Sequence, residues 1–180
     1  MPKPHASSCK TGSIMPTLPE ATTLCARLAE MMRPHVTPLT ALLGIRTGGA
    51  WIAERLHRDL GIKQPLGSID ISFYRDDFSQ RGLAKGAKAS QIPFDVEGAH
   101  IVIVDDVLYT GRTIRAAINE LFDYGRPARV DLAVLVDRGG RELPMAATWC
   151  PHTLVLPASQ TLVLEQEPVE GTLAFRIAEK

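Results

Sequence analysis

Two adjacent carboxylates, Asp105 and Asp106, stand where an apolar stretch of the chain gives way to a turn and then to a helix. The four β-branched residues before them, 101–104, predict a strand that is buried on both faces. After the turn, apolar residues recur at helical spacing from Ile114 to Phe122, which predicts an amphipathic helix. The sequence therefore places an acidic pair between a buried strand and the beginning of a helix, where side chains can meet a ligand.

The turn after the acidic pair has the properties of a phosphate site. The first backbone N–H groups of a helix have no partner inside the helix, and the helix dipole adds positive potential there. Thr110 and Thr113 add hydroxyl donors, and Gly111 allows a ligand to approach the backbone closely. Carboxylates would repel a phosphate, so Asp105 and Asp106 suit sugar hydroxyls or a Mg²⁺ ion. These residues predict a site for a phosphorylated sugar; the alternative is an ordinary strand-to-helix turn with an aspartate cap.

A second strand, glycine turn and helix occur earlier in the chain. Residues 39–45 predict a short strand, and a helix follows with Ile52, Ala53, Leu56 and Leu60 on one face. The turn between them consists of Arg46, Thr47, Gly48 and Gly49. Two glycines and a cation suit a second anion site, although such a turn alone could be only a tight connection. The presence of the first site strengthens the anion-binding interpretation.

A long polar stretch, residues 75–91, follows a predicted strand at 67–74. A loop of this length inside a compact domain is usually a functional lid or a disordered segment. Its charges can be simply solvated, or they can close over a phosphorylated ligand. The cations available for that role are Arg75, Arg81, Lys85 and Lys88.

The remaining patterns predict an α/β fold, a doubly wound and mainly parallel sheet with flanking helices. A helix is predicted from Glu20 to near Pro34, and a buried strand at 130–136. Short apolar runs at the C-terminal end predict edge or hood strands. In such a sheet, ligands bind outside the carboxyl ends of the strands. The two glycine turns and the polar turn after the strand at 130–136 all fall there. We expect a single domain at 20–180 with its lid at about 75–91 and its hood at about 137–180, after a mobile tail at 1–19.

Composition excludes some other classes of protein. The 180 residues are 45% apolar and carry 20 basic and 20 acidic side chains, so no global charge points to nucleic acid or a membrane. No apolar run approaches the roughly 20 residues of a membrane helix. The three cysteines, Cys9, Cys25 and Cys150, form no metal or disulfide pattern, and we expect a cytoplasmic protein.

The acidic-pair stretch closely resembles the 5-phosphoribosyl-1-pyrophosphate (PRPP) motif of the type I phosphoribosyltransferases. From about 42 to 176 the chain resembles the PyrR family, pyrimidine operon regulators that are also uracil phosphoribosyltransferases. The segments that carry the resemblance are GIRTGG at 44–49, DISFYRDD at 70–77, VDDVLYTGRT at 104–113, GRP at 125–127 and LAVLVDRGGRELP at 132–144.

The resemblance implies an enzyme that converts uracil and PRPP to UMP and pyrophosphate with Mg²⁺. Asp105 and Asp106 would be the catalytic pair, binding the ribose hydroxyls. Mg²⁺ would be held through the substrate, with these two carboxylates as candidate ligands. The PRPP-binding residues would be Asp105, Asp106, Val107, Leu108, Tyr109, Thr110, Gly111, Arg112 and Thr113. The pyrophosphate loop would be Arg46 to Gly49, and Val136, Asp137 and Arg138 would contact the base.

Tyr109 and two departures from the family sharpen these expectations. A 6-oxopurine phosphoribosyltransferase has an aspartate at the position of Tyr109, and a tyrosine, uncharged near neutral pH, cannot replace that carboxylate. This argues against hypoxanthine or guanine as substrate. The family usually has an arginine where this chain has Gly48, which predicts either weaker pyrophosphate binding or a greater reliance on Arg46 and the lid. It usually has a histidine where this chain has Gly140, and its RNA-binding members carry polar residues on the first helix, where Cys25 and Ala29 stand here.

Three functional hypotheses therefore stay open. The first is a uracil phosphoribosyltransferase, which we expect to be a homo-oligomer and to bind RNA weakly or not at all. The second is an RNA-binding attenuator that responds to UMP and has little catalytic activity. The third is a phosphoribosyltransferase for another base, such as adenine or xanthine. A panel of free bases with PRPP distinguishes the first from the third.

Overall fold

A parallel sheet of five strands forms the centre of the molecule. The computed structural model describes residues 18–71, 89–167 and 171–179. The strand order is β2-β1-β3-β4-β5, and every neighbouring pair in this sheet is parallel. The strands are β1 (Thr40–Ile45), β2 (Gly67–Ile69), β3 (His100–Leu108), β4 (Arg129–Asp137) and β5 (His152–Thr153). The predicted parallel α/β sheet is confirmed.

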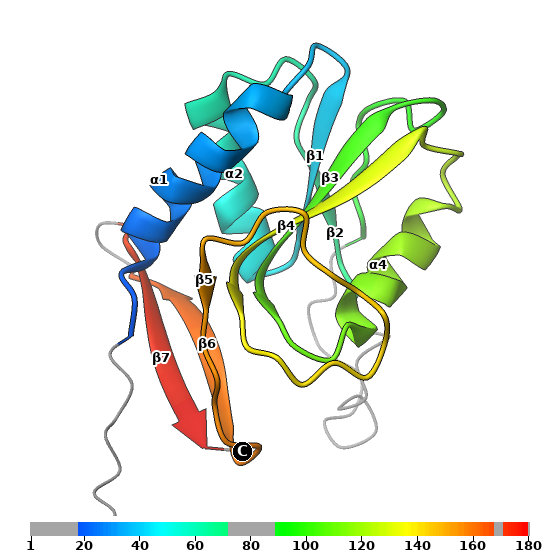
Figure 1. Ribbon diagram of the computed structural model, residues 1–180. Helices are drawn as coiled ribbons and strands as arrows, with labels where there is room; N and C mark the ends of the chain where they lie inside the picture. The colour runs from blue at the N-terminus through cyan, green and yellow to red at the C-terminus, as the bar shows by residue number, and fades with distance from the viewer. Residues whose placement is uncertain (1–17, 72–88, 168–170, 180) are drawn as a thin grey trace, which may run out of the picture.

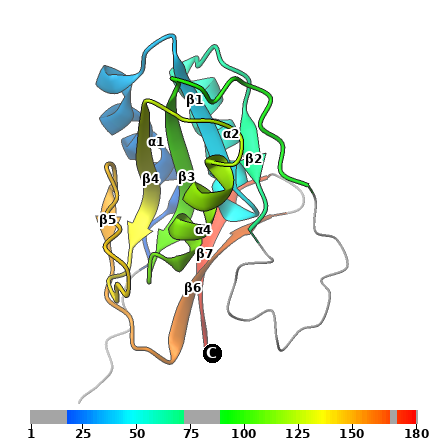
Figure 2. The ribbon, with the colours of Figure 1, turned by 90° about the vertical axis from the view of Figure 1, so that its right-hand side faces the viewer.

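Helices cover both faces of this sheet. Helices α1 (Ala21–Met32) and α2 (Gly48–Leu60) lie on one side, and α4 (Arg112–Leu121) lies on the other (Figures 1 and 2). A short 3₁₀ turn, η1 (Arg33–His35), ends the first helix and contains Pro34, which cannot continue the hydrogen-bond ladder. Among the helices that the structure describes, none has the length and apolar character needed to cross a membrane.

Alternation along the central strands divides the core into two layers. Leu42 and Val102 point to the side of α1 and α2, whereas Leu43, Ile101 and Ile103 point to the side of α4. The apolar stripe of α1 is buried in the first layer and consists of Ala21, Leu24, Cys25, Leu28, Ala29 and Met32. Because both faces are covered, the strands read as continuous apolar runs, as the sequence predicted.

The C-terminal strands form a small separate sheet. Strands β6 (Gln160–Gln166) and β7 (Leu173–Glu179) pair antiparallel and lie at the lower end of the molecule in Figures 1 and 2. The apolar run at 153–156 was predicted to be an edge or hood strand. Its first residue, Thr153, belongs to the edge strand β5 of the main sheet, beside β4, and the rest of the run is not a strand.

One sequence expectation changes, and two concern residues that lie mostly outside the described ranges. Val107 and Leu108 were predicted to begin a turn, but β3 continues through both because β4 runs alongside them and pairs with them at Val136 and Asp137. Residues 72–88, which hold most of the predicted lid, lie outside the described residues. So do residues 1–17 of the predicted tail, whereas Leu18 packs against the core.

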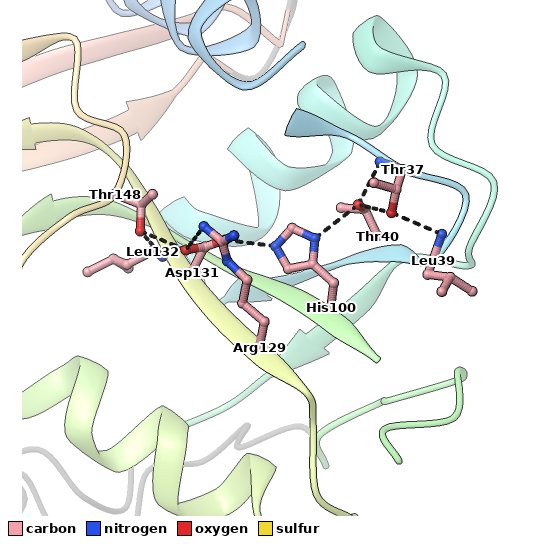
Figure 3. A network of polar contacts seen from close by, with 8 residues as sticks. All are labelled: Thr37, Leu39, Thr40, His100, Arg129, Asp131, Leu132 and Thr148. Atoms are coloured by element: carbon pink, nitrogen blue, oxygen red, sulfur yellow. Dashed lines mark hydrogen bonds and ion pairs between the residues drawn. The ribbon is translucent and has the colours of Figure 1, made fainter. Parts of the chain in front are cut away.

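A polar network joins the amino ends of the three central strands (Figure 3). His100 Nε2 lies 2.7 Å from a carboxylate oxygen of Asp131, and His100 Nδ1 lies 3.2 Å from the hydroxyl of Thr40. Asp131 also accepts hydrogen bonds from Arg129 and from the Thr148 hydroxyl. Burial raises the pKa of Asp131, but the hydrogen bonds from Arg129, His100 and Thr148 outweigh burial and hold this pKa below its ordinary value.

We predict that Asp131→Asn lowers the free energy of unfolding by roughly 1–3 kcal/mol at pH 7, because buried partners lose a charged acceptor. A carboxyl whose pKa is lowered in the folded state stabilises the fold above its unfolded pKa. That contribution disappears as the pH falls through the folded pKa. The difference between wild type and variant should therefore shrink below about pH 4.

Urea unfolding at pH 7 and at several acidic pH values measures this difference. The exposed Asp123, at the end of α4, offers a matched Asp123→Asn control that should change little. A wild-type advantage that stays constant down to pH 3 would contradict the role given to Asp131.

Candidate active site

Two turns meet at the carboxyl ends of neighbouring strands. Strands β1 and β3 pair in parallel, with Gly44 beside Val104, so the turns that follow both strands lie next to each other. A Cβ atom on Gly49 would lie 2.2 Å from the carbonyl oxygen of Val104, and one on Gly48 would lie 2.6 Å from a carboxylate oxygen of Asp106. The first turn of α2 therefore touches the end of β3 directly; a side chain at position 49 would meet fixed backbone, and one at position 48 would meet the Asp106 side chain.

The acidic pair occupies the last part of β3. Asp105 is 4% exposed, and its carboxylate accepts a hydrogen bond of 3.0 Å from the backbone N–H of Asp106. Asp106 is more accessible, and its carboxylate accepts one of 2.9 Å from the N–H of Val107. Successive side chains of a strand point to opposite faces, so the two carboxylates are not equivalent. The one next to the Gly48 turn belongs to Asp106.

The predicted phosphate turn leads from β3 into α4. Gly111 has a φ of +91°, which L side chains rarely adopt, and Arg112 begins the helix after it. The hydroxyl of Thr110 accepts a hydrogen bond of 3.3 Å from the N–H of Arg112. A Cβ atom on Gly111 would lie 3.0 Å from Met145, so the loop after β4 packs against this turn. The amino end of α4 thus stands where the sequence predicted it.

Arg46 lies in the turn after β1, which the sequence predicted to be a second anion site. Its backbone N–H bonds the carbonyl of Ile69, and its Nη2 atom donates to the hydroxyl of Ser68 at 2.9 Å. The Arg46 Nε atom is buried and has no hydrogen-bond partner among the residues that the structure describes. The peptide bond from Arg46 to Thr47 is cis. Sequence reasoning missed Ser68, because nothing in a short strand marks which hydroxyl will face an arginine on its neighbour.

The residues expected to contact the base lie at the end of β4. Val136 is buried in the core, and Asp137 bonds the N–H of Gly139 and the guanidinium of Arg141. Arg138 is 5% exposed, and its guanidinium lies over the ring of Tyr109, 4.0 Å from the ring centroid. Asp137 and Arg138 are therefore engaged with the protein itself, and the Arg138–Tyr109 stack is a contact that sequence reasoning did not foresee.

Gly140, one of the two departures from the family pattern, is explained by Tyr109. Gly140 has a φ of +73°, and a Cβ atom there would lie 2.4 Å from the Tyr109 ring. Any larger residue would therefore displace the ring from its place against the Arg138 guanidinium. Gly48 has a similar explanation, because a side chain there would have to displace the carboxylate of Asp106.

Some predicted site residues are not placed. The lid cations Arg75, Arg81, Lys85 and Lys88 lie outside the described residues. The described end of that segment is attached to β2: Gln91 forms an antiparallel bridge with Ser68, and Ser90 accepts a hydrogen bond from the N–H of Asp70. Within the described ranges, no group of three or more histidine, cysteine or acidic side chains gathers to hold a metal.

A doubly wound sheet with an acidic pair between two anion turns defines a phosphoribosyltransferase-type fold. Residues 18–151 match the phosphoribosyl transferase domain family. A purine phosphoribosyltransferase from Pyrococcus horikoshii has 27% identity and a TM-score of 0.56 over 76% of this chain and 86% of its own. A hypoxanthine phosphoribosyltransferase from Staphylococcus aureus has 18% identity and a TM-score of 0.57 over 77% and 74%, which shows the shared fold.

The bifunctional protein PyrR of Pseudomonas entomophila is 49% identical over 152 residues, covering 82% of this chain and 88% of its own. The bifunctional protein PyrR of Nitrosococcus oceani is 48% identical over 158 residues, covering 86% and 87%. The chain belongs to the PyrR family of phosphoribosyltransferases, whose members combine uracil phosphoribosyltransferase activity with regulation of the pyrimidine operon. The predicted fold class and family are both confirmed.

The contact between α2 and β3 leads to a prediction about its two glycines. Gly49→Ala should lower the free energy of unfolding by roughly 1–3 kcal/mol, because the new methyl group meets the fixed backbone of Val104. Gly48→Ala should cost less, because its methyl group meets a side chain that can rotate, and alanine also lowers the entropy of the unfolded chain. Urea unfolding of both variants checks this order, and equal or reversed costs would contradict the packing described.

Proposed function

We propose that this chain transfers a phosphoribosyl group from PRPP to uracil, which gives UMP and pyrophosphate. The observation that carries the proposal is the position of the acidic pair between two anion turns, in a chain of the PyrR family. PRPP has phosphate groups at both ends of a ribose ring. The amino end of α4 would take the 5-phosphate, and Arg46 with the amino end of α2 would take the pyrophosphate.

The chemistry passes through a ribose ring with positive charge at its anomeric carbon. The bond from that carbon to the pyrophosphate oxygen breaks, and a bond to uracil N1 forms while the N1 proton leaves. Asp105 and Asp106 would hold the ribose hydroxyls, and their negative charge favours the cationic ring. Arg46, whose buried Nε atom has no partner among the described residues, would neutralise the leaving pyrophosphate.

Mg²⁺ fits this arrangement as an ion carried by the substrate. It usually keeps several waters and is bound by one or two carboxylates together with substrate phosphates. Asp105 and Asp106 are two such carboxylates, and Asp106 lies next to the proposed pyrophosphate turn. When bound, Mg²⁺ would neutralise the charge that develops on the leaving group.

Uracil is the base that this site supports best. Tyr109, which stacks with Arg138, stands at the position where the resemblance places an aspartate in 6-oxopurine phosphoribosyltransferases, so position 109 itself offers no carboxylate to a purine ring. The solved purine and hypoxanthine phosphoribosyltransferases share the fold of the sheet with this chain, and this shared fold does not identify the base that this chain uses.

The test is product formation from PRPP and Mg²⁺ with a panel of uracil, hypoxanthine, guanine, adenine and xanthine. Uracil should be the preferred acceptor. Asp106→Asn should lower turnover of uracil by about 100-fold or more, because an amide cannot stabilise the cationic ribose. Its melting temperature should change little, and the exposed Asp123→Asn variant serves as the matched control. Turnover of hypoxanthine with none of uracil would overturn the proposal.

RNA as a partner and assembly into a homo-oligomer both stay predictions. The expectation of weak RNA binding rested partly on Cys25 and Ala29, and that ground is wrong because both are buried in the core. The exposed face of α1 and the turn after it instead carry Arg27 and Arg33. This exposed basic pair is the observation that favours RNA binding as a second function.

Three other arginines are bonded within the protein, as Arg33 is to the carbonyl of Asp59. Arg126 donates to the carbonyl of Phe122, Arg129 pairs with Asp131, and Arg141 bonds several groups of its own loop. We therefore still expect weak RNA binding. The check is a titration of labelled pyrimidine-operon leader RNA with and without UMP at two salt concentrations. Tight binding that UMP strengthens, with a steep salt dependence, would contradict this expectation.

A further inference from the structure

Three consecutive carbonyl groups, that of Leu108 at the end of β3 and those of Tyr109 and Thr110 in the phosphate turn, are held by the segment 138–143. The carbonyl of Leu108 accepts a hydrogen bond from the N–H of Arg138 at 3.0 Å, and one of 3.4 Å from Arg141 Nη1. The carbonyl of Tyr109 accepts one from the same Nη1 atom at 2.5 Å. The carbonyl of Thr110 accepts two, from the N–H groups at 142 and 143, each at 3.0 Å.

Arg141 is fixed in place by further bonds of its own. Its Nε atom donates to the carbonyl of Met145 at 2.9 Å, and its Nη2 atom pairs with the carboxylate of Asp137. The Arg141 side chain is 24% exposed, so water competes little for these bonds. A guanidinium carries five N–H donors in a rigid plane, which lets one side chain bind a carboxylate and several carbonyls together.

The direction of these carbonyls determines where the backbone N–H groups of the turn point. In a trans peptide unit, the carbonyl of one residue and the N–H of the next point in opposite directions. Because the carbonyls of Tyr109 and Thr110 face the segment 138–143, the N–H groups of Thr110 and Gly111 point away from it. A phosphate seat needs N–H groups and no carbonyl oxygens on its ligand side.

We propose that Arg141 is a positioning residue for the 5-phosphate seat: its guanidinium holds the carbonyl of Tyr109, and more weakly that of Leu108, away from the phosphate without touching the ligand, while backbone N–H groups hold the carbonyl of Thr110. This inference rests on the proposed function and adds to it. All three guanidinium nitrogens of Arg141 donate to acceptors within the protein: Nε to Met145, Nη1 to Tyr109 and Nη2 to Asp137. Arg141 therefore acts through the shape of the turn, and its charge is largely balanced by Asp137.

The test is calorimetric binding of two separate ligands, ribose 5-phosphate and Mg²⁺-pyrophosphate. Ribose 5-phosphate should bind the α4 turn, and pyrophosphate should bind the Arg46 turn. Arg141→Met should weaken ribose 5-phosphate binding by about 10-fold, the usual effect of removing a group that orients a binding residue. Pyrophosphate binding should stay as in wild type, which also shows that the variant is folded.

Two further variants separate shape from charge. Arg141→Lys keeps the charge and the pairing with Asp137, but an ammonium cannot reach the carbonyls of 109 and 145 together, so it should resemble Arg141→Met. Arg126→Met removes another guanidinium that bonds backbone carbonyls, at the far end of α4, and should bind both ligands as wild type does.

Restored ribose 5-phosphate binding in Arg141→Lys would show that charge matters and would overturn the positioning role. Equal loss of both ligands in the Arg141 variants, or no loss of either, would also overturn it. A wild-type protein that binds neither ligand would overturn the proposed function and this inference with it.

Discussion

The direct contact between the first turn of α2 and the end of β3 is the constraint on which the site depends. It brings Gly49 against the carbonyl of Val104 and Gly48 against the carboxylate of Asp106. Without it, the turn that carries Arg46 would stand farther from the acidic pair, and one small ligand could not reach both. Interiors are packed too closely to absorb an extra side chain against fixed backbone, so this contact requires glycine at position 49, whereas a side chain at position 48 would have to displace the Asp106 carboxylate.

The pairing of β3 with β4 has a second consequence for the site. Because the two strands stay paired through Leu108 and Asp137, the chain leaves β4 immediately beside the phosphate turn. The segment after Asp137 can then hold that turn through its backbone and Arg141, while Arg138 lies over the Tyr109 ring. One segment thus shapes both the phosphate end and the proposed base end of the site. At the opposite, amino ends of these strands, the His100–Asp131 network links β3 to β4.

Much of this arrangement could be predicted from the sequence, because strand and helix periodicity and the two turns are local signals. The burial of the apolar stripe of α1 and the glycine-containing turns after β1 and β3 follow from these signals. The contacts between elements could not be predicted. Nothing local shows that Gly49 meets Val104, that Arg46 meets Ser68, or that pairing with β4 continues β3 through Leu108.

The segment 137–144 illustrates a different limit of sequence reasoning. It is polar and lacks periodicity, so the sequence marks it as a turn and the family resemblance assigns part of it to the base. The structure shows that Asp137 and Arg141 are mainly bonded to each other and to neighbouring backbone. Cys25 and Ala29 cannot be compared with polar RNA-contacting residues of the family for a simpler reason: they lie on the buried apolar stripe of α1.

The central claim is that two separate turns hold the two phosphate ends of one ligand. Equilibrium binding of labelled pyrophosphate with Mg²⁺, challenged with ribose 5-phosphate or with PRPP, tests this claim most directly. The account predicts that PRPP displaces the pyrophosphate, whereas ribose 5-phosphate binds beside it and leaves it in place. Displacement of pyrophosphate by ribose 5-phosphate at a single shared site would contradict the account.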